Sequence, residues 1–155
     1  MVPFDIVNRY LSKQALAPTT VTDNTVTNTA WIDLQGNRAI AFLLHVAGIA
    51  TGGASFAVKL QHANASDFSD SADVDPVNDT QGESKAVAGY GVDATITSAY
   101  ANAAFTGATP NVERKIGYRG TKRYVRAVIT PSGNAAAATF AATALLAPNN
   151  VGYVA

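Results

Sequence analysis

Short apolar runs separated by turn-forming residues are the feature that most limits what this 155-residue chain can fold into. The runs alternate β-branched, aromatic and aliphatic residues with smaller or polar ones, and they cover residues 29–34, 38–46, 54–62, 112–118 and 123–130. A period of two indicates strands with one buried face. Several short strands with Gly, Pro and Asn clusters between them predict an all-β protein, an antiparallel sandwich of jelly-roll type.

Two segments need a decision between alternatives. Residues 38–46 are apolar at nearly every position, so we expect a strand in the middle of a sheet, covered on both faces. The alanine-rich residues 135–144 have helical propensity, but Pro131 and Gly133 precede them and β-branched Thr residues interrupt them. We therefore predict a last strand over residues 136–146, with a helix as the alternative. Residues 92–100 are a further strand candidate.

The amino-terminal residues stand apart from this pattern. Residues 1–20 contain apolar side chains with neither a strand nor a helix period, so we predict a projecting arm, followed by a β-sandwich domain over residues 21–155. An apolar arm gains little by lying in water, so it is expected to dock on another subunit. The alternative is an amino-terminal strand that pairs with its own sandwich.

Charge is scarce in this composition. Charged residues make up 14% of the chain and their sum is zero, against about 25% in an ordinary domain. Such a surface suits a protein that neighbours cover in an assembly. The absence of cysteine excludes disulfides and thiolate metal sites. The longest apolar run, residues 39–50, is too short for the roughly 20 residues of a membrane helix, and residues 1–11 do not form a signal peptide.

No catalytic or cofactor motif is found in the sequence. The two histidines, His45 and His62, lack the spacing of paired metal ligands. Residues 53–57 resemble a nucleophile elbow only until the last position, which is Ala57 rather than glycine. We therefore expect no enzyme activity, no cofactor and no catalytic or metal site, and a structural role for each histidine.

Two charged segments allow more than one interpretation. Five carboxylates lie within thirteen positions, but their spacing fits no calcium-loop template, so a solvated loop is preferred over a calcium site: Asp67, Asp70, Asp73, Asp75 and Asp79. Six of the eleven basic residues gather later in the chain: Arg114, Lys115, Arg119, Lys122, Arg123 and Arg126. We prefer pairing of this basic block with the acidic loop of a neighbouring copy over binding of nucleic acid, because the net charge is zero.

Five sequence blocks carry a resemblance to known proteins. They are QALAP at 14–18, IDLQG at 32–36, ASFAVKLQH at 54–62, KIGYRGTKRYVR at 115–126 and ITPSG at 129–133. Together they resemble the small virion proteins of tailed bacteriophages, some of which act as capsid decoration or cement proteins. Residues 89–110 depart from that pattern with an Ala-, Thr- and Gly-rich insertion.

The resemblance implies a structural protein that binds major capsid subunits and stabilises the head. It implies a homo-oligomer, with a trimer favoured, that is made in the host cytoplasm and lies on the capsid surface of the virion, with neither nucleic acid nor membrane as a partner. The alternative is a tail or head-spike component whose jelly roll binds a receptor or glycan. Copy number in the particle distinguishes the two.

We predict the interface residues from the arm and from the basic block. Alternation places Val125, Ala127 and Ile129 inward and the residues between them outward, and Tyr and Arg are favoured interface anchors. The predicted interface consists of Phe4, Ile6, Tyr10, Leu11, Tyr118, Arg119, Tyr124 and Arg126.

Overall fold

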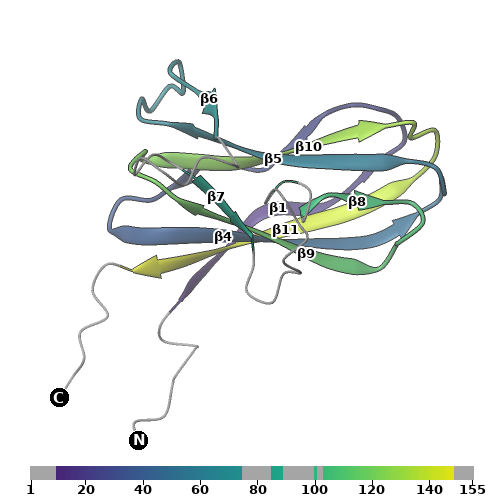
Figure 1. The fold of residues 1–155 in the computed structure, drawn as a ribbon, viewed down its shortest axis with the longest axis horizontal. Coiled ribbons are helices and arrows are strands. Elements are labelled where there is room, and N and C mark those ends of the chain that lie inside the picture. The colour runs from purple at the N-terminus through teal and green to yellow at the C-terminus, as the bar shows by residue number, and fades with distance from the viewer. Residues whose placement is uncertain (1–9, 75–84, 89–99, 101–102, 149–155) are drawn as a thin grey trace, which may run out of the picture.

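The fold is an antiparallel β-sandwich, as the sequence predicts (Figure 1). The computed structural model describes residues 10–74, 85–88, 100 and 103–148. Sheet A has the order β1-β11-β4-β9-β7, and its strands are β1 (Leu11–Val21), β11 (Ala138–Pro148), β4 (Asn37–Ile49), β9 (Val112–Arg119) and β7 (Lys85–Ala88). Sheet B has the order β2-β10-β5-β6, from β2 (Thr27–Asn28), β10 (Tyr124–Ser132), β5 (Ser55–Ala63) and β6 (Ala72–Asp73).

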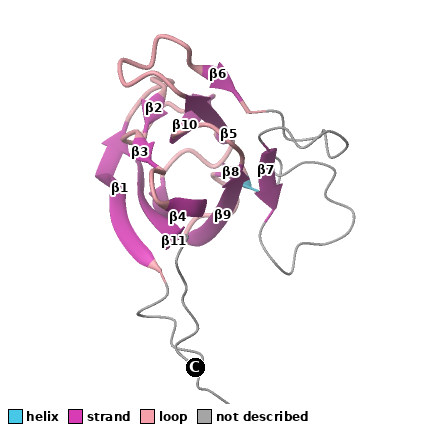
Figure 2. Ribbon diagram, turned by 90° about the vertical axis from the view of Figure 1, so that its left-hand side faces the viewer, coloured by secondary structure: helices cyan, strands magenta, loops and turns pink. Residues whose placement is uncertain are grey.

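Two further short strands extend sheet B. β3 (Ile32–Asp33) pairs with β10, and β8 (Phe105–Thr106) pairs with β5. The chain passes from one sheet to the other at every connection between successive strands except those from β2 to β3 and from β5 to β6. Figure 2 shows the two sheets on either side of one interior, with β1 curving round its side. This crossing between layers brings residues far apart in sequence onto one face.

The core lies between the sheets and is aromatic at its centre. Phe56 and Phe105 stack with ring centroids 4.8 Å apart, and Phe140 meets both rings edge-on at 6.0 Å. Alternate residues of β4, β5, β10 and β11 complete the core, and all of them are less than 10% exposed. Because the side-chain period of a strand is two, the residues between them point outward.

The prediction that β4 is covered on both faces is wrong. The strand lies centrally in sheet A, with Ile40, Phe42 and Leu44 buried, but Leu43 is only half-buried and His45 is exposed. Within the single chain, the apolar run therefore does not mark two buried faces. It gives sheet A an outer face of unusual composition.

The predicted arm boundary at residue 20 is also wrong, because Leu11–Val21 is β1 and pairs with β11 over its whole length. Ala15 and Val21 are buried in the core, which anchors the strand. Two register shifts and Pro18 interrupt β1, and the Ala30 N–H donates to the Ala15 carbonyl at 2.8 Å. These features protect a sheet edge from pairing with another chain. Residues 1–9 lie outside the described residues.

The carboxyl-terminal segment is the strand β11 rather than a helix, as predicted. It lies between β1 and β4, and buried and half-buried residues alternate from Ala138 to Leu146. Tertiary pairing on both edges overrides the helical propensity of alanine. The candidate strand over residues 92–100 falls outside the described residues except for Tyr100, whose hydroxyl donates to the carbonyls of Leu60 and Val74.

Candidate interaction surface

Four partly exposed side chains gather on the outer face of sheet B, and we call them the aromatic platform: Trp31, Phe68, Tyr124 and Arg126. They come from the segment before β3, from the loop after β5 and from β10. Tyr124 and Arg126 point outward because the intervening residue, Val125, is fully buried. The predicted outward direction of both residues is confirmed, whereas Val128 on the same strand is 5% exposed and therefore buried.

The platform is packed through its rings. Trp31 and Phe68 stack with centroids 4.6 Å apart and an interplanar angle of 12°. Phe68 meets Tyr124 edge-on at 5.4 Å, and the Arg126 guanidinium carbon lies 4.5 Å from the Trp31 ring centroid. Offset-stacked, edge-on and cation–π arrangements are each attractive geometries for aromatic rings. The four side chains therefore hold one another in place.

Hydrogen bonds fix the position of Arg126. Its Nε and Nη2 donate to the Gln61 Oε1 at 3.0 and 2.7 Å. The Gln61 Nε2 donates in turn to Asp73 at 2.8 Å, and the Lys59 ammonium donates to the other Asp73 oxygen at 2.7 Å. The bond from Lys59 lowers the pKa of the Asp73 carboxyl, with a smaller contribution from Gln61. This chain of polar contacts crosses β10, β5 and β6 and keeps the guanidinium over Trp31.

The loop that presents Phe68 is folded by its own carboxylates. Asp70 accepts hydrogen bonds from the backbone N–H groups of Asn64 and Ala65 at 2.9 and 3.0 Å, which lower its pKa. Asp67 accepts from the Ser69 N–H and hydroxyl, with the same effect on its pKa. These bonds hold Phe68 at φ 60°, a left-handed conformation that costs energy for an aromatic residue. The strained residue is the one that stacks on Trp31.

These contacts bear on the two interpretations of the acidic loop. Its described carboxylates, Asp67, Asp70 and Asp73, cap the loop or pair with Lys59. No group of three or more potential metal-ligating side chains occurs in the part of the chain that the structure describes. Asp75 and Asp79 lie outside that part.

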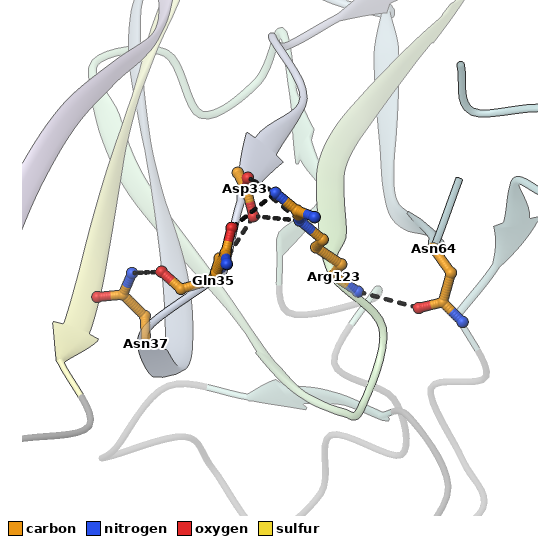
Figure 3. A network of polar contacts seen from close by, with 5 residues as sticks. All are labelled: Asp33, Gln35, Asn37, Asn64 and Arg123. Carbon is orange, nitrogen blue, oxygen red and sulfur yellow. Dashed lines mark hydrogen bonds and ion pairs between the residues drawn. The ribbon is translucent and has the colours of Figure 1, made fainter. Parts of the chain in front are cut away.

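A polar network flanks the platform at the end of the sandwich (Figure 3). The Arg123 guanidinium forms a bidentate pair with Asp33, with bonds of 2.8 to 3.3 Å, and also donates to the Gln35 side chain at 2.7 Å. The Arg123 N–H donates to the Asn64 side chain at 3.2 Å, and Asn37 donates to the Gln35 carbonyl. Arg123 lowers the pKa of Asp33, and Asp33 raises that of Arg123. The network ties the turn before β4 to β10 and to the Phe68 loop.

The predicted pairing of the basic block with a neighbouring copy's acidic loop stays a prediction, because the contacts of these residues that the structure describes lie within one chain. Within one chain Arg123 pairs with Asp33, Arg126 binds Gln61, and the Arg114 Nε donates to the Ala104 carbonyl at 3.1 Å. Lys115 lies 3.7 Å from Glu113. Arg123 and Asp33 therefore form an ion pair between distant parts of the chain, whereas Lys115 and Glu113 are neighbours on one strand and both are about half exposed.

The remaining predicted interface residues have different outcomes. Tyr118 is 1% exposed, so its prediction as a surface anchor is wrong. On β9 it occupies an inward position, and its hydroxyl lies 3.3 Å from the His62 Nδ1 and accepts from the Lys122 N–H. Tyr10, which precedes β1, and Leu11, its first residue, are 43% and 51% exposed.

Three predicted interface residues cannot be placed. Phe4 and Ile6 lie outside the described residues, and Arg119 ends β9 with a side chain that the structure does not describe. Trp31 and Phe68, conversely, belong to the platform but are not among the predicted interface residues. Trp31 directly precedes the apolar Ile32, and this alternation is the one sequence signal for an outward Trp31. Nothing local in the sequence indicates that Phe68 stacks on Trp31.

The exposed histidine has polar neighbours on sheet A. The His45 Nδ1 lies 3.8 Å from a Glu113 oxygen, and its Nε2 lies 3.5 Å from the Thr143 hydroxyl. Both distances exceed the reach of about 2.6–3.2 Å that joins a nucleophile to its base and orienting group. The arrangement is therefore a loose contact on an open sheet face.

Comparison with protein-family models, curated proteins and solved structures finds no significant match to this chain. The described residues also contain no helix of the length and apolar character that crossing a membrane requires.

Proposed function

We propose that this chain is a non-enzymatic structural protein of a tailed-phage particle, a decoration or cement protein that binds major capsid subunits through the aromatic platform. The observation that carries the proposal is the prebuilt cluster of Trp31, Tyr124 and Arg126 on an open sheet face. Trp, Tyr and Arg are the residue types that dominate the energy of protein interfaces. A platform locked by its own contacts loses little conformational entropy when a partner binds.

The rest of the molecule supports a binding role over a catalytic one. Charged residues are few, and most of the described ones near the platform are already paired, so the partner is recognised by shape and apolar contact. A shell protein must make many identical contacts without inducing aggregation. The bulges and Pro18 on β1 serve the second requirement by blocking edge-to-edge pairing.

Binding to capsid shells stripped of this protein tests the proposal. Arg126→Ala is expected to weaken association by about 1 to 3 kcal/mol, because it removes a cation–π contact and leaves Gln61 without its donor. Thr130→Ala is the matched control, since Thr130 points outward from the same strand but is outside the platform. An unchanged midpoint of dissociation for Arg126→Ala, or an equal loss for the control, contradicts the proposal.

A tail or head-spike protein that binds a receptor glycan is the second candidate. The observation in its favour is that the aromatic rings lie beside hydrogen-bonding groups of Lys59, Gln61 and Asp73, a combination that suits a sugar as well as a protein. Labelling this protein in intact particles separates the candidates. Hundreds of copies over the shell support a cement protein, whereas a few copies at one vertex, together with glycan binding that Trp31→Ala abolishes, support a spike.

A further inference from the structure

Among the residues whose side chains the structure describes, the outer face of sheet A bears no charged residue on its two central strands. Ten outward positions alternate with the buried ones of β4 and β11: Ala39, Ala41, Leu43, His45, Ala47, Thr139, Ala141, Thr143, Leu145 and Ala147. His45 is the one titratable group among them. The outer face of sheet B, by contrast, carries Lys59 and Arg126. A sheet face in contact with water is normally polar, so this composition is that of a covered face.

A hollow of about 420 Å³ opens in the same face. Its lining includes Pro18, Ala47, Thr139 and Ala141. It lies where β1 and β4 each shift register against β11, because a bulge bends the strand away from its neighbour. Larger side chains of His45, Glu113 and Phe140 complete the lining, and the volume of the hollow leaves room for the side chain of a partner.

β9 adds two opposite charges at the flank of this face. Glu113 and Lys115 point outward two residues apart, and their side chains are 47% and 56% exposed. Consider a two-fold axis that lies in the plane of the face, runs perpendicular to the strands and passes through Arg114. This axis places Glu113 of the first copy over Lys115 of the second copy. By symmetry it also places Lys115 of the first copy over Glu113 of the second. The register puts Leu44 and Ala142 on the same line, so this axis crosses the middle of the face.

At the hollow, the same axis matches a large side chain to a smaller one. Residues at equal distance from Ala142 exchange places, so Leu145 of one copy lies over Thr139 of the other, in the hollow. Across Leu44, Ala41 lies over Ala47 by the same rule. The pairs follow from strand register alone, yet they match opposite charges on β9 and set Leu145 over the hollow.

We propose that a second copy of this chain binds this face, forming a two-fold dimer in which Leu145 of each copy fills the hollow of the other. Four strands of nine residues measure about 19 by 30 Å in projection, or about 600 Å². Accessible surface exceeds its projection, so the face approaches the ~800 Å² that each partner of a standard interface contributes. The dimer is independent of the proposed capsid role, because it uses the opposite sheet from the aromatic platform.

Sedimentation equilibrium of the full chain tests the dimer with a matched pair of variants. The wild type is expected at twice 16.0 kDa. Ala41→Glu, at the centre of sheet A, should weaken dimerisation at least tenfold. Ala57→Glu, on the outer face of sheet B, should leave it unchanged. Circular dichroism confirms that each variant is folded, and a monomeric or trimeric wild type overturns the proposal.

Charge exchange on β9 gives a second test that does not depend on the fold tolerating a new charge in the face. Glu113→Lys and Lys115→Glu each set like charges against one another across the axis, so each is expected to weaken the dimer several-fold. The double exchange restores the opposite-charge pairs and should recover the wild-type dissociation constant. Equal dissociation constants for all four proteins, or failure of the double exchange to recover, would show that these residues do not meet across a two-fold axis.

Discussion

Truncation of Phe68 tests whether the aromatic platform is packed as described. Phe68→Ala removes one stacked and one edge-on ring contact, with Trp31 and Tyr124. Each such pair contributes about 0.5–1.5 kcal/mol, so the free energy of unfolding should fall by about 1–3 kcal/mol. For a domain of this size the melting temperature should then drop by about 2–4 °C per kcal/mol.

The conformation of Phe68 sharpens this test. At φ 60° alanine keeps the strain of the left-handed region, whereas glycine does not. Phe68→Gly should therefore be more stable than Phe68→Ala by about 1 kcal/mol, the reverse of the usual order. Ser66, in the same loop but without a positive φ, is the control, since Ser66→Gly should be less stable there than Ser66→Ala.

Urea unfolding monitored by fluorescence provides the assay, because Trp31 is the single tryptophan and lies in the platform. Far-UV circular dichroism of the same samples reports the sheets as a whole. If Phe68→Ala unfolds within 0.5 kcal/mol of the wild type, on the order of the scatter of surface substitutions, the platform is not packed. If glycine proves less stable than alanine at this position, the left-handed conformation is wrong.

Three further predictions follow from the described residues. Gly107→Ala should destabilise the fold by about 2 kcal/mol or more, measured by urea unfolding, because a Cβ there would collide with the backbone of Thr51. Burial, and to a smaller extent the charge of Lys122, lowers the pKa of His62. Below pH 6.5 the unfolded chain therefore binds a proton that the folded chain does not, so the free energy of unfolding should fall as the pH drops. The slope of that free energy against pH should be smaller in His62→Gln. Deleting residues 1–18 removes most of β1 and should lower the melting temperature of the sandwich.

The strands are the part of this protein that local sequence determines. Alternation along a strand depends only on which side chains prefer the interior, so residues 54–62, 112–118 and 123–130 were placed within about two positions of their strands. The same rule put Tyr124 and Arg126 on an outer face. Side-chain period is a local property, and no tertiary information is needed to apply it.

Pairing between distant segments decided the rest. The apolar pattern of residues 1–20 does not reveal that β1 pairs with β11, because that contact joins the two ends of the chain. Tyr118 is buried because the fold places its strand beside β4 over the core, and Arg123 meets Asp33 only because β3 lies against β10. The sequence by itself determined which residues can form strands and which of their faces are apolar. Only the tertiary structure decided which strands are neighbours, and therefore which side chains form the platform, because the free energy of long-range pairing depends on the whole fold.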